Sequence, residues 1–138
     1  VDDSQPSDAA IETIVDLPIE DRREVIFCSA AAGDDLIGAP GYLYAEVHEA
    51  LHEHAQYVVD KAVALARAHG VAAEGHVVDG SAERALIAAA ADRSADLIVL
   101  GSPGRRGLQR FFHGSVAESG VRSALIPVLI ARTAAARV

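Results

Sequence analysis

Three short runs of the chain are continuous in branched and aliphatic residues, without the alternation that marks a strand with one solvent-facing side. They occupy residues 25–30 (VIFCSA), 96–100 (DLIVL) and 126–131 (IPVLIA). Runs of this length and composition predict strands that are buried on both faces. A weaker run at 74–78 ends at Asp79-Gly80, a dipeptide typical of a turn.

Helical patterns lie between these runs. Ser7 can cap a helix that ends near Leu17, before Pro18, and Ser81 can cap another. The predicted helices span 7–17, 44–69, 81–92 and 115–123. Strands that alternate with helices indicate parallel strands joined by crossover connections, which is an α/β fold.

The longest predicted helix, 44–69, has apolar residues spaced three and four apart, and Gly70 ends it. We expect this stripe to face the sheet. Its members are Tyr44, Val47, Leu51, Ala55, Val58, Ala62 and Leu65.

Length and charge narrow the classes of function. A chain of 138 residues has room for one domain, residues 1–138. Its net charge of −8 argues against a nucleic-acid partner and against an anionic membrane surface. No segment has the run of about 20 apolar residues that a membrane span needs, and no signal-peptide pattern is visible, so we expect a cytoplasmic protein. Cys28 is the single cysteine, which excludes an internal disulfide and indicates a small core residue.

The segment that follows the 96–100 strand carries the clearest chemical signal. It reads GSPGRRGLQRFFHGSVA, with Gly101, Gly104 and Gly114-Ser115 in the spacing Gly-x2-Gly-x9-Gly-Ser. Glycines allow close approach of the backbone to a ligand and positive φ angles, and the start of a helix favours phosphate oxygens. The spacing fits neither a Walker loop nor the dinucleotide fingerprint.

This motif resembles that of the ATP-binding universal stress proteins, and the opening VDDSQPSD and the segment DGSAERAL resemble other parts of that family. The resemblance implies a sheet of five parallel strands in the order 3-2-1-4-5 with helices on both faces, the adenine nucleotide alpha hydrolase-like fold. The family's first strand precedes its Val-Asp pair, so we expect most of that strand to be absent from a sequence that begins at Val1.

The resemblance also implies a ligand and its contacts. ATP would lie at the switch point between the family's strands 1 and 4, with Mg²⁺ or Mn²⁺ held by the phosphates. Asp2 would accept a hydrogen bond from the adenine amino group, and Ala30 would line the base pocket. The ribose contacts implied are Leu100 and Gly101, and the phosphate contacts are Gly104, Gly114, Ser115 and Val116.

The function implied is that of a nucleotide-dependent sensor or effector in the stress response, present as a homodimer that pairs through strand 126–131. No residue positions an attacking water or acceptor, so the chain is not expected to be an enzyme beyond slow ATP hydrolysis or self-phosphorylation. A nucleotide-independent dimeric interaction module is the main alternative.

A zinc site is a further alternative, because His48-Glu49-Ala50-Leu51-His52 satisfies H-E-x-x-H on a predicted helix. His54 lies roughly 200° around the helix from His52, so it cannot serve as the third ligand. A distant group such as His76 or His113 would be needed to complete the site.

Overall fold

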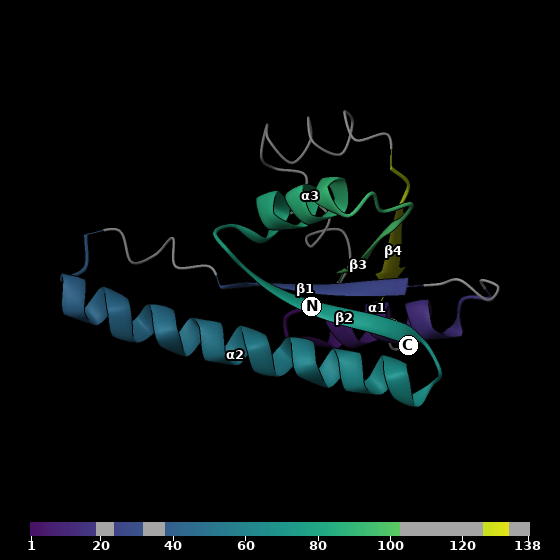
Figure 1. Cartoon of the computed structure of the whole chain (residues 1–138), viewed down its shortest axis with the longest axis horizontal. Coiled ribbons are helices and arrows are strands. Elements are labelled where there is room, and N and C mark those ends of the chain that lie inside the picture. The colour runs from purple at the N-terminus through teal and green to yellow at the C-terminus, as the bar shows by residue number, and fades with distance from the viewer. Residues whose placement is uncertain (19–23, 32–37, 103–125, 133–138) are drawn as a thin grey trace, which may run out of the picture.

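The computed structural model describes residues 1–18, 24–31, 38–102 and 126–132. Helices and strands alternate through most of this part of the chain (Figure 1). The elements are α1 (Gln5–Asp16), β1 (Glu24–Ala31), α2 (Gly41–Ala68), β2 (Ala72–Asp79), α3 (Ala82–Asp92), β3 (Ile98–Ser102) and β4 (Val128–Arg132). The α/β class predicted from the alternation is therefore confirmed.

All four predicted strands are present, with shifted ends. The weak run at 74–78 is the centre of β2, a full strand of eight residues. The two later strands begin two residues beyond the predicted positions, because their ladder starts where the Ile98 N–H donates to the Pro127 carbonyl oxygen at 3.0 Å. β3 therefore includes Gly101.

The strands pair in parallel as β1 with β2 and β3 with β4. Within the described residues these are two separate two-stranded sheets. The nitrogen of Val1 donates to the carbonyl oxygen of Cys28 in β1 at 2.7 Å, so the start of the chain lies against the edge of the first sheet. The five-strand order stays a prediction.

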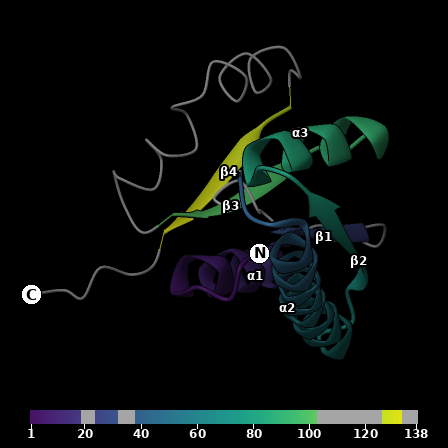
Figure 2. The ribbon, with the colours of Figure 1, turned by 90° about the vertical axis from the view of Figure 1, so that its left-hand side faces the viewer.

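Helices cover both faces of the β1–β2 pair. α2 and α1 lie on one side of it and α3 on the other (Figures 1 and 2). Between α1, β1, α2 and β2 lies a cluster of buried apolar side chains. Its members are Ile11, Val25, Phe27, Ala62, Ala66, Val71 and Ala73.

Only the C-terminal half of α2 is buried, which corrects the predicted stripe. Tyr44 and Leu65 are 47% and 42% exposed, although both were expected to face the sheet. The residues that do pack are Ala55, Val58, Val59, Ala62 and Ala66. The first two turns of the helix are exposed and contribute little to the core.

The predicted cap of α1 is wrong, whereas the predicted cap of α3 lies at the expected position. α1 begins two residues earlier than expected, at Gln5. Its N-cap is Ser4, whose Oγ accepts from the Ser7 N–H at 3.3 Å. Ser7 is buried in the first turn. Ser81 occupies the N-cap position of α3 without a side-chain hydrogen bond. The predicted helix at 115–123 lies outside the described residues.

The predicted ends at glycines are confirmed. Gly70, with φ of +77°, follows the end of α2, and Gly80, with φ of +93°, makes the turn after β2. Both angles lie in the left-handed region that glycine adopts without strain. Among the described helices, none has a stretch that is long and apolar enough to cross a bilayer.

Candidate nucleotide site

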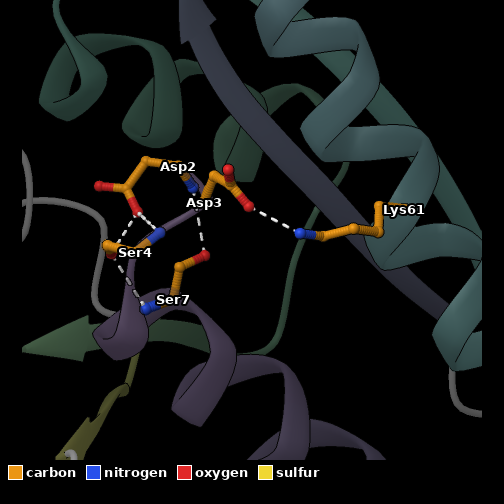
Figure 3. Close-up of polar contacts among 5 residues, drawn as sticks. All are labelled: Asp2, Asp3, Ser4, Ser7 and Lys61. Atoms are coloured by element: carbon orange, nitrogen blue, oxygen red, sulfur yellow. Dashed lines mark hydrogen bonds and ion pairs between the residues drawn. The ribbon is translucent and has the colours of Figure 1, made fainter.

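Asp2 lies over the first turn of α1, held by a compact set of hydrogen bonds (Figure 3). Its Oδ1 accepts from the backbone N–H of Ser4 at 3.2 Å and from the Ser4 hydroxyl. Its own N–H donates to Oγ of Ser7 at 3.1 Å. The side chain is nevertheless exposed, and a carboxylate accepts up to about four hydrogen bonds. Asp2 therefore keeps capacity for a ligand.

The neighbouring Asp3 connects this segment to α2. The ammonium of Lys61 lies 2.6 Å from Oδ1 of Asp3 (Figure 3). The hydrogen bond from Lys61, and then its charge, hold the pKa of Asp3 below its usual value. The contribution of this pair to stability is thus present above the usual pKa of an aspartate and is lost as pH falls through the lowered one.

Gly101, in β3, lies against the same turn of α1. A Cβ added to Gly101 would lie 1.8 Å from the carbonyl oxygen of Pro6 and 2.8 Å from the nitrogen of Ser7. Among the described glycines, positive φ occurs at Gly38, Gly70 and Gly80. Gly101 therefore does not use the positive φ that glycine allows, and the close approach that it permits here is to the backbone of α1.

Two of the expected site residues lie at this turn. Asp2 and Gly101 both contact it, and Leu100 precedes Gly101 in β3. Ala30 is half-buried in β1, two residues beyond the Cys28 carbonyl that binds Val1. The segment that carries Asp2 thus runs from the edge of β1 to the helix turn that Gly101 contacts.

The expected phosphate contacts cannot be placed in the same way. Gly104, Gly114, Ser115 and Val116 lie outside the described residues. Their convergence on a ligand with Gly101 stays a prediction.

The model of the universal stress protein family matches residues 1–132. The chain belongs to the universal stress protein family. The resemblance drawn from the glycine spacing and the opening residues is therefore confirmed.

Individual relatives agree with this assignment. A universal stress protein of Methanocaldococcus jannaschii is 34% identical over 86 residues, which are 62% of this chain and 51% of that protein. The chain thus spans about half the length of this curated relative.

Two solved structures show the shared fold. One is a universal stress protein in complex with cAMP, with a TM-score of 0.59, 23% identity, and coverage of 95% of this chain and 93% of that one. The other is a universal stress protein family protein from Arabidopsis thaliana with AMP bound, with a TM-score of 0.63, 17% identity, and coverage of 96% and 84%.

Cys28 is half-buried in β1 of this universal stress protein chain, and its backbone carbonyl accepts a hydrogen bond from the nitrogen of Val1. Burial raises the pKa of its thiol above the usual value. A raised pKa lowers the thiolate fraction, and the thiolate is the reactive form. Cys28 is nevertheless outside the buried core cluster, so the core position predicted for it is not confirmed.

The H-E-x-x-H segment of this family member lies on α2, where His48 and His52 share a face. The third side chain that they meet is Asp79, at the end of β2. The suggestion of His76 was wrong, because its Nε2 contacts Glu74 at 3.1 Å and Arg93 at 2.6 Å. His113 lies outside the described residues. Asp79 was predicted to mark a turn, and it is the last residue of β2. Its contact with the two histidines depends on the packing of α2 against β2.

Proposed function

We propose that this chain binds an adenine nucleotide, ATP in the first instance, and acts as a nucleotide-dependent sensor or effector in the cytoplasmic stress response. The observation that carries the proposal is the meeting of Asp2 and Gly101 at the first turn of α1, beside the end of β1. These are residues that the family motif assigns to the nucleotide. The proposal concerns binding and includes no turnover.

The chemistry of the described residues suits the base and the sugar. Asp2 is an exposed acceptor, as the exocyclic amino group of adenine requires, and Ala30 is small enough to leave room for a flat ring. Leu100 and Gly101 lie in β3 and would be near the ribose.

The phosphates would contact Gly104, Gly114, Ser115 and Val116. Backbone N–H groups of a glycine-bearing loop and of a helix start suit phosphate oxygens. The two related structures carry AMP and cAMP, which share adenine and differ at the phosphate. Adenine is therefore the part of the ligand that these two structures support.

A divalent ion would be held mainly by the phosphates. The carboxylates near the proposed base site are Asp2, which accepts from Ser4, and Asp3, which is paired with Lys61. Magnesium characteristically binds to substrate phosphates and water with few protein ligands, and it would neutralise phosphate charge when bound.

A dimer is part of the proposal. β4 pairs with β3 on one side and stands at the edge of that two-stranded sheet. An apolar edge strand can pair with a second copy of itself. A folded, dimeric protein that gives no saturable heat with ATP would favour the nucleotide-independent interaction module.

The assignment of adenine to Asp2 is tested by Asp2→Asn. The amide keeps an oxygen for Ser4 but turns an N–H₂ group towards the adenine amino group, so we expect affinity for ATP to fall roughly 10- to 100-fold, the range for losing a hydrogen bond to a charged group. Isothermal titration measures this directly.

Asp16→Asn is the matched control, since it removes the same charge from an exposed position at the far end of α1. It should bind ATP as the wild type does. Equal affinities of wild type and Asp2→Asn would show that Asp2 does not contact the base.

A further inference from the structure

Three potential metal ligands meet where the end of β2 passes α2. Nε2 of His48 lies 3.1 Å, and Nε2 of His52 2.7 Å, from the same Oδ1 atom of Asp79. All three atoms lie within 4.8 Å of one another. We propose that His48, His52 and Asp79 form a binding site for a zinc-like divalent cation. This inference is independent of the nucleotide proposal.

The local structure explains why these side chains converge. Residues four apart lie on one face of a helix, so His48 and His52 project together from α2. α2 packs tightly on β2, because Gly75 has no side chain and a Cβ there would lie 1.9 Å from Cγ1 of Val59. The turn at Gly80 directly follows Asp79, so Asp79 is the last residue of β2.

The two rings are further ordered by their neighbours. The His48 and His52 ring centroids are 4.9 Å apart, and the ring of Tyr44 stacks on His48 at 5.8 Å with an interplanar angle of 21°. Three rings therefore follow one another along the helix. This arrangement restricts the rotation of His48 and presents both Nε2 atoms to Asp79.

A small cation requires particular separations between the three ligand atoms. Zinc binds imidazole nitrogen and carboxylate oxygen at about 2.0–2.2 Å, so ligand atoms around a tetrahedral ion lie ~3.3 Å apart. The contacts of 2.7 and 3.1 Å are hydrogen-bond lengths and would have to lengthen towards this separation, whereas the two histidine nitrogens, which lie within 4.8 Å of each other, would have to approach. Each ring would bind through Nε2 after its proton moves to Nδ1, which leaves its charge unchanged.

The ligand set defines the class of cation. Two imidazoles and one carboxylate suit zinc and neighbouring first-row ions, whereas magnesium and calcium prefer all-oxygen sites. The side chains of His48, His52 and Asp79 are 36%, 39% and 67% exposed, so solvent can reach the site. Three protein ligands leave at least one coordination position for water.

As a surface ion-pair cluster alone, the same contacts would contribute little to stability, because solvent screens exposed pairs. Substitutions can therefore distinguish a metal site from a cluster that only stabilises the fold. Loss of one ligand should hardly change the stability of the metal-free protein but should strongly weaken metal binding.

The test is calorimetric titration of ZnCl₂ into the full chain, freed of metal and nucleotide, near neutral pH. The wild type should bind one zinc ion per chain. Asp79→Asn and His52→Ala should each lose at least roughly tenfold in affinity, because removal of even an outer-shell partner costs 10- to 100-fold.

His54→Ala is the matched control, since His54 is an exposed histidine of the same helix that projects from another face. It should bind zinc as the wild type does, and circular dichroism should show all variants folded. Absence of saturable zinc binding, or equal affinities in Asp79→Asn, His52→Ala and wild type, would overturn the proposal.

Discussion

Gly101→Ala should lower the free energy of unfolding by about 3 kcal/mol or more, the upper part of the range for inserting an atom into a packed interior. The added Cβ would lie 1.8 Å from the oxygen and 2.2 Å from the carbon of the Pro6 carbonyl. These are backbone atoms of a helix that packs on β3 and β4, so no side-chain rotation relieves the overlap. Either α1 must move away from β3 or the strand must bend.

Urea denaturation followed by circular dichroism measures this change. Gly41→Ala is the control, because a Cβ at Gly41 meets no atom within 4 Å and alanine is favourable within a helix. That variant should be as stable as the wild type or slightly more so. A Gly101→Ala protein with wild-type stability would mean that α1 and β3 do not approach each other in this way.

Gly114→Asp should abolish nucleotide binding, with a loss of roughly 100-fold or more. The family motif assigns this glycine to the phosphates, and a carboxylate beside a polyanion adds like-charge repulsion to the loss of space. The variant should fail to give saturable heat with ATP.

Gly107→Asp is the matched control, because it places the same charge in the nine-residue spacer between the motif glycines. Its affinity for ATP should fall far less than that of Gly114→Asp. If both variants bind ATP as the wild type does, the phosphates lie elsewhere.

Much of the fold could be predicted because it depends on local pattern. The apolar run 25–30 is the core of β1, and Gly70 and Asp79-Gly80 end their elements as expected. Each of these features depends on residues within a few positions of one another. The beginning of α1 was missed because Ser4 and Ser7 are both good caps, and the choice depends on Pro6, which favours the first turn of a helix.

The remaining features depend on contacts between distant parts of the chain. Asp79 joins His48 and His52 only because α2 lies against β2, and no local pattern states that. The sequence motif relates Gly101 to a ligand, and the structure adds a second reason for glycine at this position, the close contact with the first turn of α1. The start of α2 is exposed because the sheet does not extend beneath it, although the apolar spacing of the helix continues there.

Calorimetric titration of the wild-type chain with ATP and AMP, against GTP as a base control, tests the central claim most directly. We expect saturable binding of one adenine nucleotide per chain and little binding of GTP, since Asp2 as an acceptor selects the adenine amino group. A folded protein that gives no saturable heat with either adenine nucleotide would contradict the account.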